Sequence, residues 1–182
     1  MIDTFDHRNA QAKPEFTMNE RNYWIGVVSK EHVAIGVAGG FTQLNHGKAG
    51  PLERMRAGDG FAFYSPRLAY PNGAPLQAFT ALGRIRDGVV YQARAHEGFA
   101  PFRLAVDYLP VQDAPIKPLI EALSFIRSKT HWGAAFRFGF VRVPEADFAR
   151  IATAMGRDFA RDFPNDVAHD VPHDVPQPTV PA

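Results

Sequence analysis

The chain has 182 residues, enough for one domain with a hydrophobic core and short for two. It contains no cysteine, which excludes disulfides, thiolate nucleophiles and cysteine-ligated zinc. Residues 1–161 hold 20 basic and 15 acidic residues, a net charge of +5, and four acidic residues follow with no basic one. A mildly basic body is compatible with phosphate contacts.

The sequence shows neither a signal peptide nor a membrane span. Its first residues are polar, and no stretch approaches the roughly 20 apolar residues that cross a bilayer. We therefore expect a cytoplasmic protein that does not bind or cross a membrane.

Composition divides the chain into three parts. Residues 1–20 are polar and aperiodic, residues 21–162 carry nearly all the aromatic and branched side chains, and residues 163–182 are rich in Pro and Asp. We predict a flexible lead (or a start at Met18), one domain, and a disordered acidic tail. His169 and His173 have the spacing of a metal pair on a helix, but neighbouring prolines disfavour that helix, so no metal site is expected.

The first half of the folded region predicts a strand that leads into a helix. Residues 23–29 form an apolar run typical of a buried strand, and Ser29 is then a good N-cap. Gly39 and Gly40 end the helix, because glycine accepts the left-handed conformation there. Two further elements follow, a short helix around residues 52–55 and a strand over 61–64 that Pro66 stops.

The second half predicts a hairpin, more strands and two helices. Residues 79–85 and 89–94 flank Asp87-Gly88, a hairpin signal. Residues 116–126 have one apolar helical face, and residues 136–143 alternate as a strand with one aromatic face. The remaining elements are a strand over 102–108 and a helix over 145–155. Short strands interleaved with short helices predict an α+β domain around a curved sheet or partial barrel.

Motifs for the commonest enzyme classes are absent. Gly47-Lys48 is not a phosphate-binding P-loop, since Thr42 replaces the first glycine and Ala49 follows the lysine. The chain also lacks the nucleophile elbow G-x-S-x-G and the zinc motif H-E-x-x-H. We therefore assign no catalytic residue and no cofactor.

Segments spread through residues 22–150 resemble, in order and spacing, the EVE-domain family of the PUA-like superfamily. They read YWIGVVSKEHV, GGFTQLNHGK, PLERMRAGD, YSP, FRLAVDYLP, PIKPLIEALSFI and KTHWGAAFRFGFVRV. The resemblance implies a PUA-like fold, a curved sheet or pseudo-barrel with short peripheral helices, related to YTH and ASCH domains. Known relatives place a base in a concave pocket with aromatic walls, and EVE proteins are suspected of reading modified bases. By position, Ser29 and Phe41 would correspond to pocket-forming residues of YTH domains.

Eight residues are candidates for ligand binding: Ser29, Phe41, Gln43, His46, Lys48, Tyr64, Ser65 and Trp132. Four of them share one loop bounded by glycines. This loop either lines a pocket or is a packed loop whose polar side chains bond backbone groups. If the loop lines a pocket, the amide of Gln43 recognises a base edge with both its donor and its acceptor, and Lys48 contacts a phosphate. Tyr64 and Ser65 close a strand, facing either the pocket or a turn. Trp132 lies either in the wall of the pocket or in the hydrophobic core, whereas Trp24 is expected in the core.

The function hypothesis is a nucleic-acid-binding module that recognises a modified nucleotide of DNA or RNA in an aromatic pocket. One alternative is a hydrolase acting on a modified nucleoside, with Glu31, His46 or Lys48 transferring protons. Another is a small protein-interaction subunit with an unidentified partner.

Overall fold

The computed structural model describes residues 21–94 and 98–164. The predicted lead over residues 1–20, most of the predicted tail, and the histidine pair within that tail lie outside the described residues. None of the helices in the described ranges is long and apolar enough to cross a bilayer.

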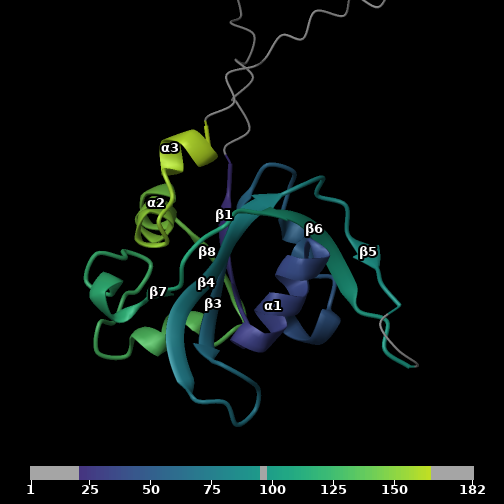
Figure 1. Cartoon of the computed structure of the whole chain (residues 1–182), viewed down its shortest axis with the longest axis horizontal. Coiled ribbons are helices and arrows are strands. Elements are labelled where there is room, and N and C mark those ends of the chain that lie inside the picture. Colours follow the sequence, from purple (N-terminus) through teal and green to yellow (C-terminus); the bar gives the residue numbers. More distant parts are fainter. Residues whose placement is uncertain (1–20, 95–97, 165–182) are drawn as a thin grey trace, which may run out of the picture.

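The described residues form one mixed sheet, in which strands β2-β6-β4-β3-β1-β8 lie side by side while β5 pairs with β6 and β7 with β4. The strands are β1 Tyr23–Val27, β2 Phe41–Thr42, β3 Gly60–Arg67, β4 Pro75–Ile85, β5 Tyr91–Gln92, β6 Phe102–Tyr108, β7 Ala114–Pro115 and β8 Phe140–Val143. The central pair β1 and β3 is parallel, and the other pairs are antiparallel. The sheet curls into a partial barrel around the first helix (Figure 1).

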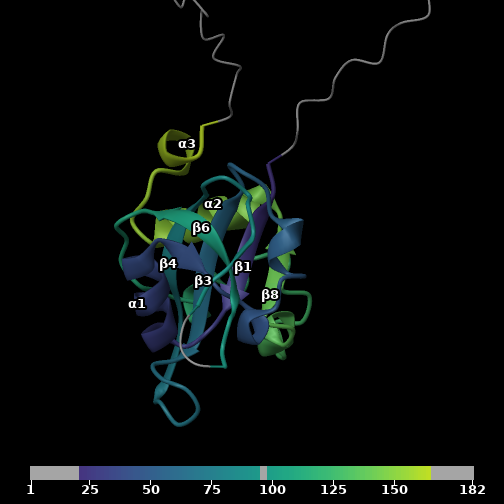
Figure 2. The ribbon, with the colours of Figure 1, turned by 90° about the vertical axis from the view of Figure 1, so that its right-hand side faces the viewer.

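The helices are short and lie on both sides of this sheet. They are α1 Lys30–Gly39, α2 Glu145–Ala154 and α3 Phe159–Asp162, with single 3₁₀ turns η1 Asn45–Gly47, η2 Leu52–Arg54, η3 Lys117–Leu119 and η4 Trp132–Phe136. α1 fills the hollow of the curled sheet, and α2 and α3 cover its outer face (Figures 1 and 2). The prediction of an α+β fold with a curved sheet and short peripheral helices is confirmed.

Alternation along the central strands separates two hydrophobic cores. Ala62 and Tyr64 of β3 face the core under α2, whereas Phe61 and Phe63 face the core under α1. Trp24 belongs to the second core, as expected, and its indole N–H donates to a carboxylate oxygen of Asp59 at 2.9 Å. The sheet is therefore buried on both faces over its central strands.

The helix predicted over residues 116–126 is wrong. Only the single turn Lys117–Leu119 is helical, and the rest of the segment runs as turns across the outer core. Side chains replace the missing helical hydrogen bonds: Lys129 Nζ donates to two backbone carbonyls of the segment at 2.7 and 2.9 Å. The buried carboxylate of Asp147 accepts from the backbone N–H of Phe125 at 2.9 Å. Both partners lie beyond the segment itself, so no local pattern reveals them.

The aromatic strand predicted over residues 136–143 is half wrong. Its first part is the end of η4 and a turn, and only Phe140–Val143 pairs with β1. The turn is made by Gly139, whose φ of 80° is left-handed, so the phenylalanine alternation does not mark one continuous strand.

Three other predictions differ from the structure. β5 pairs with β6 rather than with β4, so the hairpin around Asp87-Gly88 is wrong. β3 continues past Pro66 to Arg67, with shifts in register against β4. Phe163, the first residue assigned to the tail, is buried and packs its ring against Phe148.

Candidate functional site

The carboxyl ends of the parallel strands β1 and β3 lie together at one end of the sheet. Just past these ends, the backbone N–H of Val28 donates to the carbonyl of Tyr64 at 3.2 Å. The first turn of α1 meets the chain after β3, since the N–H of Glu31 donates to the carbonyl of Leu68 at 2.9 Å. This end therefore brings together the start of α1, the end of β3 and the loops that follow (Figure 1, below the strands).

Ser29 occupies the N-cap position of α1, as predicted, with the extended backbone that position requires. Its hydroxyl makes no capping bond, however. Instead, Ser29 Oγ lies 3.1 Å from Nδ1 of His32, one turn along the helix. The serine thus positions an exposed imidazole in the first turn of α1.

The η1 loop packs against a turn from the other end of the chain. Asn45 Nδ2 donates to the carbonyl of Phe138 at 3.3 Å, and a Cβ on Gly139 would overlap the Asn45 side chain. The carbonyl of Gly139 in turn accepts from the N–H of Val27 at 2.9 Å. The Phe138-Gly139 turn therefore ties the end of β1 to the η1 loop, and His46 of that loop is exposed.

Phe41 lies under a guanidinium group. The ring is only 9% exposed, and the guanidinium carbon of Arg103 lies 3.8 Å from its centre. Arg103 Nε donates to Gln43 Oε1 at 3.1 Å, which holds the guanidinium over the ring. These three side chains form the Phe41–Arg103–Gln43 cluster, built on the pairing of β2 with β6. Arg103 was missed from the sequence because alternation places it on the polar face of β6 without showing which strand lies beside it.

Thr42 has a buried hydroxyl with no hydrogen-bond partner. It pairs in register with Leu104, is fully buried, and faces away from Phe41 because neighbouring strand residues point to opposite sides. Among the residues that the structure describes, no other buried side-chain polar atom is left unpaired. Such an atom requires an explanation, for example a bound water or ligand group.

Tyr64 and Ser65 are buried, and Trp132 is half-buried. Tyr64 is 2% exposed and its ring stacks on Phe136 at 4.1 Å, with Trp132 edge-on at 6.5 Å. Burial raises the pKa of the Tyr64 hydroxyl to about 12. The Ser65 hydroxyl is buried and lies 2.7 Å from that of Thr80, at a shift in register between β3 and β4. Packing explains these three positions, and only Trp132 is partly open.

The residues suggested for hydrolysis do not assemble. Glu31, His46 and Lys48 are exposed, and within the described ranges their side chains make no hydrogen bond or ion pair with one another. The described part of the chain also holds no group of three or more His, Asp and Glu side chains that would bind a metal ion. Within the described residues, these three side chains therefore form no acid–base pair with one another.

A shallow groove lies at the opposite end of α1. It is lined by the last residues of the helix, by the end of β6 and by Arg86, which directly follows β4. The Arg86 side chain pairs with Asp107 of β6 at 2.8 Å. None of the eight predicted ligand-binding residues lines it.

Comparisons with known proteins identify the family of this chain. The profile of the family described as "EVE domain" matches residues 22–154. A UPF0310 protein of Mycolicibacterium gilvum is 49% identical over 135 residues, covering 74% of this chain and 96% of that protein. The UPF0310 protein YdcG of Bacillus subtilis is 45% identical, covering 74% and 92%. The crystal structure of Atu2648 from Agrobacterium tumefaciens is 13% identical, with a TM-score of 0.47, covering 75% of this chain and 94% of that one. The chain belongs to the EVE-domain family.

Proposed function

We propose that this chain is a nucleic-acid-binding module that holds a base, preferentially a modified one, on the Phe41–Arg103–Gln43 cluster. Membership of the EVE family supports nucleic-acid binding in general. The observation that supports the particular site is the Arg103 guanidinium, whose carbon lies 3.8 Å from the centre of the Phe41 ring.

A guanidinium over an aromatic ring is a platform for a base. The ring stabilises the cation through its negative face, and the planar guanidinium offers its outer face to a further flat group. Proteins stack unpaired bases on aromatic rings and on Arg planes in this way. Since Phe41 is covered by Arg103, the base in this proposal lies on Arg103 rather than directly on the phenylalanine.

In this proposal Gln43 recognises the edge of the base through hydrogen bonds. Its amide oxygen is occupied by Arg103 Nε at 3.1 Å, which leaves the two N–H donors of the amide for the ligand. They fit an acceptor on the base, such as a ring nitrogen or carbonyl oxygen. One added methyl in an apolar niche contributes only about 0.8 kcal/mol, so preference for a modified base needs this edge contact as well.

The other predicted residues take supporting roles. His46 and Lys48 are exposed in the loop that follows β2 and suit phosphate contacts, and Ser29 bonds His32. Trp132 lies edge-on to Tyr64, which stacks on Phe136. Ser65 supports the same region through its bond to Thr80.

The test is a binding screen against modified and unmodified nucleosides, comparing the wild type with Arg103→Lys and Gln43→Leu. Arg103→Lys keeps the charge and removes the plane, so stacking predicts about a tenfold loss of affinity. The matched control is Arg86→Lys, a change of the same kind in the groove at the other end of α1.

Equal affinity of Arg103→Lys and wild type would overturn the stacking role. Chemical turnover of a nucleoside in the same screen would favour the hydrolase instead. Absence of binding by the wild type to every nucleoside and oligonucleotide would leave the protein-interaction subunit as the better hypothesis.

A further inference from the structure

We propose that the η1 loop and the Phe138-Gly139 turn form a second contact surface, on which a nucleotide flanking the held base stacks. The inference rests on the proposed function and deepens it, because it makes the ligand a single-stranded nucleic acid rather than a free nucleoside. We name this contact surface the Phe138 platform, consisting of His46, Lys48, Arg137 and Phe138.

The first observation is an exposed aromatic ring with no packing role. Phe138 is 73% exposed, although large apolar side chains in this fold are mostly buried. The Arg137 guanidinium carbon lies 5.4 Å from the centre of its ring. An exposed ring beside an exposed cation combines the two groups that proteins use to hold single strands: a stacking face for a base and a charge for its phosphate.

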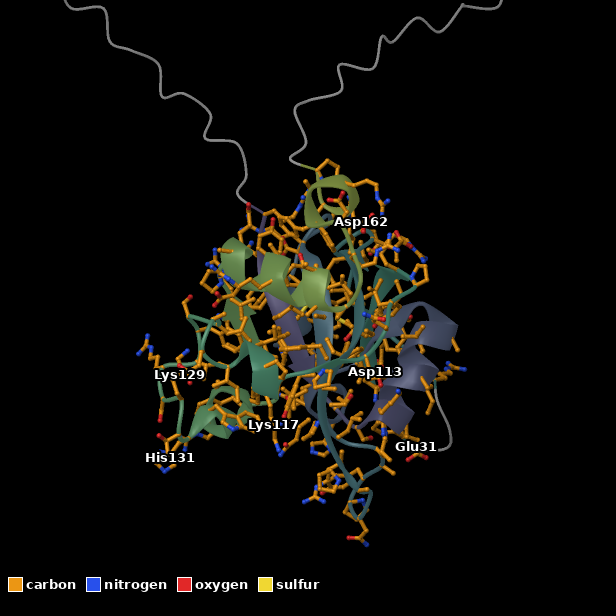
Figure 3. The ribbon with its side chains drawn as sticks, turned by 60° about the vertical axis from the view of Figure 1, so that its left-hand side comes forward. Glu31, Asp113, Lys117, Lys129, His131 and Asp162 are labelled. Atoms are coloured by element: carbon orange, nitrogen blue, oxygen red, sulfur yellow. The ribbon has the colours of Figure 1, made fainter. Side chains whose placement is uncertain are left out.

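The second observation is the charge of the two segments that meet there. No acidic residue lies between Glu31 and Glu53, and none lies between Glu121 and Glu145. The two intervals contain five cations: Lys48, Arg127, Lys129, Arg137 and Arg142. The two intervals meet at the contact between Asn45 and Phe138, next to Lys48 and Arg137, whereas Lys129 donates to backbone carbonyls elsewhere. The charges of Lys48 and Arg137 complement a phosphate backbone. Lys129 and His131 lie at the end of the molecule opposite Asp162 (Figure 3).

The third observation is that the surface is held in a strained, fixed shape. Asn45 and His46 have left-handed φ angles of 46° and 58°, uncommon for residues other than glycine. The bond from Asn45 to the Phe138 carbonyl fixes one side of the loop, and Gly47 packs closely on Pro101 at the other. Strained backbone that persists is found preferentially at binding sites. His46 and Lys48 lie on the same loop, which bonds the backbone carbonyl of Phe138 through Asn45.

The three observations together favour a nucleic acid over a protein partner. A protein-binding patch is typically apolar at its centre and poor in lysine, whereas this surface has one exposed ring among cations. The Phe138 platform is tied to the end of β1 through Gly139, whose carbonyl accepts from the N–H of Val27.

The experiment measures binding of fluorescein-labelled oligothymidylate and oligouridylate of about ten nucleotides, a length within the usual site sizes of single-strand binders. Phe138→Ala and Phe138→Leu are expected to weaken binding about tenfold, because both remove the stacking face, while Phe138→Trp retains it. Lys48→Gln and Arg137→Gln are expected to reduce the slope of log affinity against log salt by about 0.7 each. The two oligonucleotides distinguish DNA from RNA.

The controls are Tyr70→Ala, which removes another exposed ring, and Arg86→Gln, which removes a cation elsewhere. Neither is expected to change oligonucleotide binding by more than about twofold. Because Phe138 is exposed, thermal unfolding of its variants should match the wild type, and this comparison excludes misfolding as the cause of a loss.

Failure of this inference is distinguishable from failure of the proposed function. If oligonucleotides bind equally to Phe138→Ala and wild type while Arg103→Lys loses nucleoside binding, the Phe138 platform is wrong and the base site stands. If Phe138 variants lose oligonucleotide binding and Arg103→Lys loses nothing, the base site is wrong and the Phe138 platform stands. Absence of oligonucleotide binding by the wild type at low salt, or a change of oligomeric state in Phe138→Ala, would overturn the Phe138 platform.

Discussion

The Arg103 guanidinium carbon lies 3.8 Å above the centre of the Phe41 ring, and Gln43 holds it there. Phe41 lies in β2, Gln43 directly follows that strand, and Arg103 lies in β6. The strands β2 and β6 are paired antiparallel. The buried ring of Phe41 therefore supports the planar cation of Arg103. A ligand at this site would contact Arg103 rather than Phe41.

Arg103→Ala should cost little stability. The cation–ring contact is at a partly exposed site, where such contacts contribute about 0.5–1 kcal/mol. We therefore expect the free energy of unfolding in urea to fall by about that amount, with nucleoside binding lost. A fall of several kcal/mol would mean that Arg103 is mainly structural.

Thr42→Val should be neutral or stabilising in the absence of ligand. The substitution removes a buried hydroxyl that has no partner, and leaving such a group unpaired costs about 1–3 kcal/mol. Thermal unfolding of both proteins checks this. A clear destabilisation would show that the hydroxyl is satisfied, for instance by a bound water. Weaker ligand binding by the variant would instead assign the hydroxyl to the site.

Asp59→Ala should destabilise the fold strongly. The buried carboxylate accepts from the Trp24 indole at 2.9 Å, from the N–H of Asn22 at 2.9 Å and from the N–H of Arg56 at 3.0 Å. Removing it leaves buried donors unpaired, so we expect a loss of about 3 kcal/mol in chemical denaturation. Asp87→Ala, at an exposed turn, is the control and should lose less than about 1 kcal/mol.

Gly139→Ala should destabilise the turn that joins β1 to the η1 loop. The position has a φ of 80°, and the added Cβ would overlap the Asn45 side chain. The expected loss is about 2 kcal/mol in urea unfolding, part from the backbone and part from the overlap. Asn45→Gly in the same chain should recover the second part. If Gly139→Ala alone unfolds like the wild type, the close contact is not a feature of the native protein.

Stability should fall in acid partly through Asp162. The hydrogen bond from Arg157 at 2.7 Å and the neighbouring Arg161 lower the pKa of this carboxyl below its usual value. A carboxyl whose pKa is lower in the folded state stabilises the fold above its unfolded pKa, about 3.9, and loses that contribution as the pH falls below it. The difference in unfolding free energy between wild type and Asp162→Asn should therefore be constant near neutral pH and shrink below about pH 4. A difference independent of pH would show that the ion pairs contribute nothing.

Local patterns predicted the regular elements well. The apolar run of β1, the glycines after α1 and the amphipathic face of α2 each act within a few residues, so the sequence reveals them. The segment over residues 116–126 could not be predicted in this way. Its polar groups are satisfied by Lys129 and Asp147, which the fold brings together from beyond the segment.

The candidate site was predictable in part for the same reason. The loop with Phe41, Gln43, His46 and Lys48 carries polar side chains between glycines, and that pattern is visible in the sequence. Pairing between β2 and β6 is not visible, so Arg103 was absent from the prediction. The alternation of phenylalanines likewise suggested one strand, whereas the left-handed Gly139 turns Phe138 outward into solvent.

The central claim is that a base stacks on Arg103 above Phe41, and the Arg103 Nε–H resonance tests it most directly. A ¹H–¹⁵N NMR titration with the nucleoside that binds best would follow this signal, assigned by its loss in Arg103→Lys. The account predicts a progressive shift that saturates with the same affinity as binding, because a second ring now lies on the guanidinium. Saturable binding that leaves the Arg103 signal unmoved would contradict it and place the base elsewhere on the protein.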